Sequence, residues 1–152
     1  MNIVLYQPEI PPNTGNIART CACVGASLHL IRPLGFSTDE KAVRRAGLDY
    51  WDKLDIHYYD SLEELFTTYQ ESNFYFTTKF AANHYTEVDY TAEDFLVFGR
   101  ETAGLPDYIL EDYPEQCIRI PMRKNIRSLN LSNAVSIVVY EALRQIDFPN
   151  LI

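Results

Sequence analysis

The sequence lacks the marks of membrane, secreted and disulfide-stabilised proteins. Its 152 residues contain no run close to the ~18 apolar residues of a membrane span. The N-terminus starts on a strand-like run at 2–6, without a basic region or cleavage site for export. Cys21, Cys23 and Cys117 are odd in number and lack metal-ligand spacing, so we expect buried free thiols. These absences favour one cytoplasmic domain over residues 1–152.

The signatures of several common enzyme classes are also missing. His29, His57 and His84 are scattered, so neither a metal site nor a catalytic triad is expected. There is no G-x-G-x-x-G motif and no P-loop, which argues against an enzyme that cradles nucleotide phosphates. No serine or cysteine lies in a nucleophile context. If the protein is an enzyme, the nucleophile therefore belongs to its substrate.

Basic residues are scarce, with 13 Lys and Arg against 21 Asp and Glu and a net charge of −8. This balance argues against a non-specific nucleic-acid binder. Residues 49–71 and 87–115 hold 16 of the acids and 2 of the bases, which leaves 5 acids and 11 bases elsewhere. The bases that could form one basic face are Arg19, Arg32, Lys41, Arg44, Arg45, Lys79, Arg119, Arg123, Lys124 and Arg127. An RNA partner is therefore permitted.

Short strand-like segments alternate with helix-like segments along the chain. Strand-like runs are found at 2–6, 28–32, 55–59, 73–78, 95–99 and 117–121, with helix-like stretches near 14–25, 39–46, 61–71, 105–112 and 129–146. This alternation predicts an α/β fold, a mainly parallel sheet with helices on both faces. Ligands bind beyond the carboxyl ends of such strands, so the loops after Tyr6, Phe76, Phe98 and Ile120 are the candidate site.

Two of these loops carry suggestive residues. After the first strand, Asn13 or Thr14 can cap a helix that carries Arg19, which is either a functional residue or an ordinary surface arginine. After the fifth strand, Gly99 and Gly104 bracket an exposed loop, and Pro106 fits the first position of a helix. Glycine there either allows a ligand to approach the backbone closely or only allows the chain to form a tight turn. Thr77-Thr78-Lys79 adds hydroxyl groups at the same end of the sheet.

The most informative loop follows the last strand. Ser128, Asn130, Ser132 and Asn133 are more helix-capping residues than one helix start needs, which suits a grip on a small polar ligand. The alternative is a well-capped last helix of an α/β domain. On that helix, Tyr140 is predicted to pack in the core, with presentation to a partner as the alternative.

Three motifs occur in order at this end of the sheet: N-x5-R (Asn13 to Arg19), F-G-x-E-x-x-G-L-P (Phe98–Pro106) and I-P-M-x5-S-L-N-L-S (Ile120–Ser132). With these motifs, and with Arg-Arg-Ala-Gly-Leu-Asp-Tyr at 44–50, the chain resembles the SPOUT superfamily of knotted methyltransferases. Within it the resemblance is to the small tRNA (cytidine/uridine-34-2′-O)-methyltransferases. The resemblance covers essentially the whole chain.

The resemblance implies a C-terminal trefoil knot, S-adenosylmethionine as cofactor, a homodimer packed through its first and last helices, and a tRNA anticodon loop as partner. The cofactor contacts it implies are Phe76, Gly99, Ile120, Met122, Ser128, Leu129 and Asn130. Arg19 is implied as the catalytic residue, acting on the cofactor of the other chain. Substrate contacts are expected at Asn13, Glu101, Arg123, Arg127 and Tyr140. No metal is implied.

The implied reaction is attack of a ribose 2′-hydroxyl on the methyl group of the cofactor. Arg19 would act by orienting a phosphate or stabilising the developing alkoxide, because a guanidinium stays protonated in proteins. Two other hypotheses stay open. The enzyme could methylate another tRNA position or rRNA, or the chain could be a non-catalytic knotted module that binds the cofactor or RNA.

Overall fold

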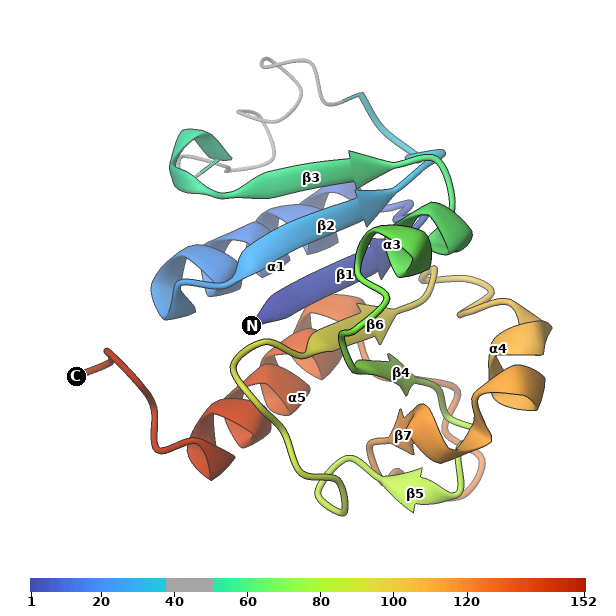
Figure 1. Ribbon diagram of the computed structural model, residues 1–152. Helices are drawn as coiled ribbons and strands as arrows, with labels where there is room; N and C mark the ends of the chain where they lie inside the picture. The colour runs from blue at the N-terminus through green and yellow to red at the C-terminus, as the bar shows by residue number, and fades with distance from the viewer. Residues whose placement is uncertain (38–50) are drawn as a thin grey trace.

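The computed structural model describes residues 1–37 and 51–152 (Figure 1). Among these residues, seven strands form one sheet in the order β3-β2-β1-β6-β4-β7-β5, and every strand pair is parallel. The strands are β1 (Asn2–Tyr6), β2 (Ser27–Ile31), β3 (Ile56–Tyr59), β4 (Phe74–Thr77), β5 (Asn83–His84), β6 (Phe95–Phe98) and β7 (Cys117–Arg119). The six predicted strands and their parallel arrangement are confirmed, whereas the two-residue β5 was not predicted.

Within the described residues, four α-helices connect or follow these strands: α1 (Pro11–Val24), α3 (Leu62–Thr68), α4 (Asp107–Asp112) and α5 (Leu131–Gln145). The 3-10 turns η1 (Trp51–Lys53) and η2 (Pro114–Gln116) precede β3 and β7. The predicted helix at 39–46, the motif at 44–50 and the predicted basic residues Lys41, Arg44 and Arg45 lie outside the described residues. The other four predicted helices are confirmed.

Helix α1 begins earlier than the sequence predicted. Its N-cap is Ile10, and Pro11 and Pro12 occupy the first helical positions, where a missing N–H costs nothing. The predicted cap by Asn13 or Thr14 is therefore wrong, because both residues lie inside the helix and are buried. Pro106 is likewise the N-cap of α4 and not its first helical residue.

The helices cover both faces of the sheet, as predicted (Figure 1). On one face α1 and α5 pack together over residues such as Ile3 and Leu5 of β1. On the other face α3 and α4 cover Val4 of β1 together with the aromatic side chains of β4 and β6. Alternate residues of each strand point to opposite faces, so the near-continuous apolar strands fill both cores.

Two expectations about individual side chains are wrong. Cys21 and Cys117 are buried, and burial raises the pKa of the Cys21 thiol to about 12, but Cys23 is exposed on α1. Tyr140 is 49% exposed and so does not pack in the core. Both residues lie on the outward sides of α1 and α5, where nothing in the described chain covers them.

Candidate functional site

A cavity of about 770 Å³ lies at the carboxyl end of the sheet, where the sequence predicted a site. Its volume is in the range of pockets that bind small molecules. It is lined by the loops after β4, β6 and β7 and by the first residues of α1, α4 and α5, including Asn13, Thr77–Phe80, Phe98–Asp107, Ile120, Met122 and Arg127–Leu131. In a parallel sheet these loops meet because all the strands end on the same side.

Glu101 joins the loop after β6 to the loop after β1. Its carboxylate accepts hydrogen bonds from Glu9 N at 2.9 Å, Ile10 N at 3.1 Å and Asn13 Nδ2 at 3.2 Å. In return, the carboxylate of Glu9 accepts from Thr102 N at 3.1 Å and from Thr102 Oγ1 at 2.8 Å. Hydrogen bonds to ionised carboxylates are about twice as strong as neutral ones, so this reciprocal pair holds the two loops together.

Asn130 extends the same network to the third loop. It is the N-cap of α5, and its Oδ1 accepts from Ser132 N at 2.9 Å and from Ser132 Oγ at 2.7 Å. Its Nδ2 donates to Asn13 Oδ1 at 2.9 Å. The amide of Asn13 therefore lies between Glu101 and Asn130, using its donor for one and its acceptor for the other. One chain of hydrogen bonds fixes all three motifs relative to each other.

The glycines of the second motif shape a tight hairpin. Arg100 and Gly104 exchange two backbone hydrogen bonds of 3.0 Å, and Gly104 has φ +74°, which glycine adopts without strain. A Cβ on Gly99 would lie 2.6 Å from Gly104 Cα, and closer still to the Gly104–Leu105 peptide. The tight turn therefore requires glycine at position 99, because the chain's own backbone fills the space that a side chain would need.

Two polar atoms at the cavity are buried without a hydrogen-bond partner among the described residues. They are Thr77 Oγ1 and Arg100 Nε, and both residues line the cavity. The guanidinium of Arg100 lies over the Tyr6 ring, 5.3 Å from its centroid. An unsatisfied buried polar group costs about 1–3 kcal/mol, so a polar ligand group that bonded either atom would recover that cost. Thr77 was predicted at this end of the sheet.

Nine of the thirteen predicted site residues line the cavity. They are Gly99, Ile120, Met122, Ser128, Leu129 and Asn130 of the predicted cofactor set and Asn13, Glu101 and Arg127 of the predicted substrate set. Arg19, Phe76, Arg123 and Tyr140 are not among the lining residues of this chain. The structure thus brings most of the set together, while the individual roles stay predictions.

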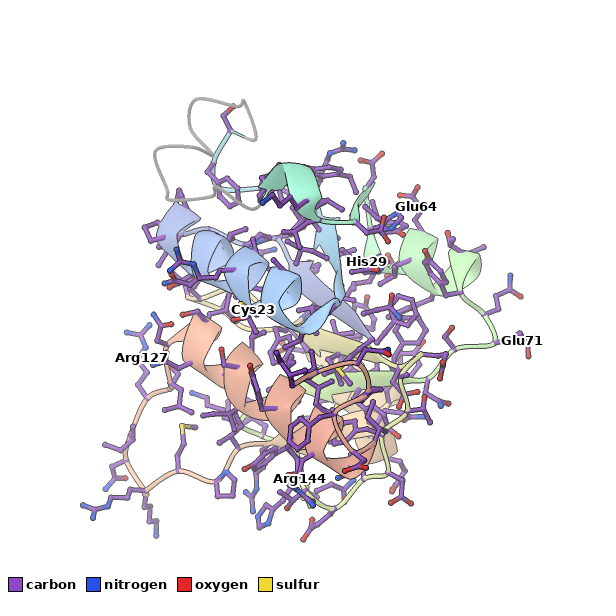
Figure 2. All side chains as sticks on the ribbon, turned by 90° about the vertical axis from the view of Figure 1, so that its left-hand side faces the viewer. Cys23, His29, Glu64, Glu71, Arg127 and Arg144 are labelled. Carbon is purple, nitrogen blue, oxygen red and sulfur yellow. The ribbon has the colours of Figure 1, made fainter. Side chains whose placement is uncertain are left out.

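The four remaining residues lie in different places. Phe76 is buried in the core, with its ring centroid 5.3 Å from that of Tyr113, so any cofactor contact would come from its main chain. Arg123 is exposed on the loop after β7. Arg19 and Tyr140 are exposed on α1 and α5, which lie side by side (Figure 2).

The predicted basic residues within the described ranges lie in different parts of the structure. Arg127 lines the cavity close to the start of α5 (Figure 2), and Lys79 lines it from the loop after β4. Arg32 instead pairs with Asp60 at 3.0 Å, and Arg119 lies 3.3 Å from His84 Nε2. Of the predicted basic residues that the structure describes, Lys79 and Arg127 are the two that line the cavity.

Sequence reasoning missed three contributors to the site. Glu9 and Thr102 form the reciprocal bonds with the neighbouring loop, and Phe80 stands at the cavity with 69% of its surface exposed. Glu9 lies in the Pro-Glu-Ile-Pro-Pro segment at 8–12, just before the first of the three motifs, and this position was a usable signal. Nothing in the sequence around Phe80 distinguishes it from a core phenylalanine.

The described residues contain neither a candidate metal site nor a candidate membrane-spanning helix. No group of three or more His, Cys, Asp or Glu side chains in residues 1–37 and 51–152 could hold a metal ion. No helix in these ranges is long and apolar enough to cross a bilayer.

Comparison with known proteins agrees with this geometry. Residues 1–140 match the SpoU rRNA Methylase family. A tRNA (cytidine(34)-2′-O)-methyltransferase of Yersinia pestis is 55% identical over 156 residues, covering 98% of this chain and 96% of the relative. A solved structure described as "Structural insights into the 2-OH methylation of C/U34 on tRNA" matches with a TM-score of 0.89 and 41% identity, over 96% of this chain and 95% of that one.

A further match is to a cofactor complex. The SpoU methyltransferase AviRb from Streptomyces viridochromogenes, in complex with AdoMet, has a TM-score of 0.83 and 25% identity over 97% of this chain and 58% of that one. The resemblance to SPOUT methyltransferases, predicted from three motifs, is thereby confirmed. Because the family match spans residues 1–140 of 152, the chain belongs to the SpoU methylase family.

Proposed function

We propose that the protein transfers a methyl group from S-adenosylmethionine to the ribose 2′-hydroxyl of nucleotide 34, the wobble position, of tRNA. The observation that carries the proposal is the match, across nearly the whole chain, to a relative named for this activity. The cavity at the carboxyl end of the sheet supplies the physical counterpart, since its three loops contain the motifs by which the family was predicted.

The cavity fits the cofactor. Apolar side chains such as Ile120, Met122 and Leu105 can receive its hydrophobic parts, and the unpartnered Thr77 hydroxyl can bind one of its polar groups. We infer that Gly99, Ser128, Leu129 and Asn130 also contact it, as the family resemblance implies. The hydrogen-bond chain through Asn13 keeps these loops in place before any ligand enters.

When bound, S-adenosylmethionine supplies a methyl group on a positively charged sulfur, open to attack by an oxygen. The residues of this chain hold the 2′-hydroxyl in line with that methyl group and manage one proton. Arg19 remains a cation and so stabilises the developing alkoxide or orients a phosphate that takes the proton. Met122 and Leu105, beside the cavity, reduce the access of water.

We infer that the active form is a homodimer in which Arg19 serves the cavity of the partner. Arg19 lies on α1 and does not line the cavity of its own chain, and the adjacent outer side of α5 exposes Ile137 and Tyr140 by 36% and 49%. Apolar and aromatic side chains of this kind are typical of protein interfaces. Tyr140 would then lie close to bound RNA, as would Arg123 and Arg127.

The dimer hypothesis has a direct test by complementation. Arg19→Ala removes the catalytic cation, and Gly99→Val disrupts the cavity, so each homodimer should be inactive. Mixed and allowed to exchange subunits, the two variants should recover up to about one quarter of wild-type transfer, because half of the molecules are heterodimers with one intact site. Recovery of no activity, with exchange shown by mass spectrometry, would contradict action across the interface.

We also infer that the C-terminal segment forms a trefoil knot. The strand order β6-β4-β7 and the contact of Asn130 with Asn13, 117 residues apart, support a return of the chain close to the first helix. Knots are nearly absent from other folds, so this inference depends on the family. The cytoplasmic location expected from the sequence stays a prediction, compatible with a tRNA substrate.

Ribosomal RNA is the second candidate substrate, because the family that matches is described as an rRNA methylase family. Both candidates are tested by incubating the wild-type protein with labelled S-adenosylmethionine and total RNA, then mapping the methylated nucleosides. The proposal predicts 2′-O-methylcytidine or 2′-O-methyluridine at position 34 of tRNA. Label in rRNA, or at another tRNA position, would contradict it, and cofactor binding without transfer would favour a non-catalytic module.

A further inference from the structure

An aromatic ring stands at the rim of the cavity on the turn that follows β4. Phe80 lines the cavity, yet 69% of its surface is exposed. The turn beneath it is fixed: Phe80 N donates to Thr78 Oγ1 and Ala81 N donates to Thr78 O, both at 3.4 Å. Ala81 is buried and anchors the turn in the core. The ring is therefore held outward by an ordered backbone.

A positive charge lies directly on this ring. Lys79 Nζ is 4.9 Å from the centroid of Phe80, within the distance at which an ammonium group is attracted to an aromatic face. Lys79 also lines the cavity. The pair thus combines a flat apolar surface with a cation. Proteins that hold single-stranded RNA use this combination, in which bases stack on aromatic rings and phosphates meet basic side chains.

We propose that Phe80 and Lys79 form a stacking platform for an unpaired base of the RNA substrate, at or next to the methylated nucleotide. This inference rests on the proposed function, whose substrate is a single-stranded anticodon loop. The charge of Lys79 favours RNA over the cofactor as the occupant, because the cofactor carries a cationic sulfur and RNA carries phosphates. The exposure of Phe80 agrees, since a ring that covered the cofactor would lie deeper in the cavity.

Substitutions at Phe80 can separate base stacking on the aromatic ring from simple apolar contact. In steady-state methyl transfer to tRNA, Phe80→Ala should raise the KM for tRNA by about 5-fold to 150-fold, the usual effect of removing a base-stacking ring. Phe80→Trp should restore the wild-type KM, whereas Phe80→Leu should behave like Phe80→Ala. The affinity for S-adenosylmethionine, measured by calorimetry, should stay within about twofold in all three.

Two further variants complete the experiment, one at Lys79 and a control at a distant phenylalanine. Lys79→Ala should raise the KM for tRNA and make it less dependent on salt, since a lost phosphate contact lowers the number of released counterions. Phe148→Ala is the matched control: Phe148 is 38% exposed near the C-terminus and does not line the cavity. This control should leave the KM unchanged.

The outcomes separate this inference from the function on which it rests. Wild-type protein that methylates tRNA, with an unchanged KM in Phe80→Ala or full activity in Phe80→Leu, would overturn the platform alone. The platform would also be overturned if Phe80→Ala reduced the affinity for S-adenosylmethionine as strongly as it reduced methyl transfer. The ring would then contact the cofactor. Wild-type protein that transfers no methyl group to any tRNA would overturn the proposed function, and the platform with it.

Discussion

The carboxyl end of the sheet and the sheet face under α3 are held together by different forces. At the carboxyl end, Glu101, Asn13 and Asn130 connect half-exposed loops by hydrogen bonds. Under α3, stacked and edge-on rings pack against one another; this aromatic cluster consists of His29, Tyr59, Phe66, Tyr69, Phe74, Phe76, Phe95 and Tyr113. Substitutions in the cluster should therefore reduce stability, and those at the loops should reduce activity.

The largest loss of stability is expected in the aromatic cluster. Phe95 is 2% exposed, and its ring centroid lies 4.6 Å from that of Tyr69 and 4.8 Å from that of Phe74. Phe95→Ala should lower the free energy of unfolding by about 3–5 kcal/mol, the usual cost of emptying such a site. Denaturant unfolding measures it, with the exposed Phe80→Ala as control. A loss below about 1 kcal/mol would contradict the packing described here.

The same cluster should make stability dependent on pH. Burial and the neighbouring His57 lower the pKa of His29 from 6.5 to about 4. Between these values the unfolded chain binds a proton that the folded chain does not, so the free energy of unfolding should decrease as the pH falls through this window, by at most about 3 kcal/mol. His29→Gln should show a shallower decrease in denaturant unfolding from pH 7 to pH 4. Equal slopes would show that His29 is not the group responsible.

Glu101→Gln should give a smaller loss of stability and a larger loss of activity. A neutral amide has one acceptor oxygen where the carboxylate has two, so at least one of its three donors loses its partner. We expect the free energy of unfolding to fall by about 1–3 kcal/mol and methyl transfer to fall by about 100-fold. The control is Glu111→Gln, an exposed carboxylate at the same cavity. Full transfer by Glu101→Gln would remove the loop network from the account.

The smallest stability effect is expected at Asn130, where two roles can be separated. Asn130→Ser keeps a good helix cap but is too short to bond Asn13, so stability should fall by only about 1 kcal/mol, the cost of leaving the buried Asn13 oxygen without its donor, while transfer drops. Asn130→Ala removes both roles and should cost about 1 kcal/mol in addition. If both variants transfer methyl groups as well as the wild-type protein does, the Asn130–Asn13 hydrogen bond does not position the loops.

The contrast also explains what could be predicted from the sequence. Strands and helices followed from apolar periodicity, and the parallel sheet from their alternation, because both depend on local patterns. The three loops could be assigned to one site because parallel strands place their carboxyl ends together. Their bonds to each other, such as Glu101 to the amides of Glu9 and Ile10, depend on the geometry of the folded chain and gave no sequence signal.

Errors in the prediction have physical causes of the same kind. Asn13 was predicted as a cap by residue type, but two prolines start α1 earlier and leave its amide for the loop network. Whether Gly99 admits a ligand or serves a turn stayed open, because only the folded chain shows that the Gly104–Leu105 backbone occupies the space beside it. The exposure of Phe80 and Cys23 could not be predicted, because their residue types are usually buried.

The central claim, methyl transfer to the ribose of nucleotide 34, is tested most directly by removing the acceptor oxygen from the substrate. A tRNA with a 2′-deoxynucleotide at position 34 should accept no labelled methyl group from the wild-type protein. Matched tRNAs with the deoxynucleotide at position 33 or 35 should still be labelled. Labelling of the 34-deoxy tRNA at the level of unmodified tRNA would contradict the account.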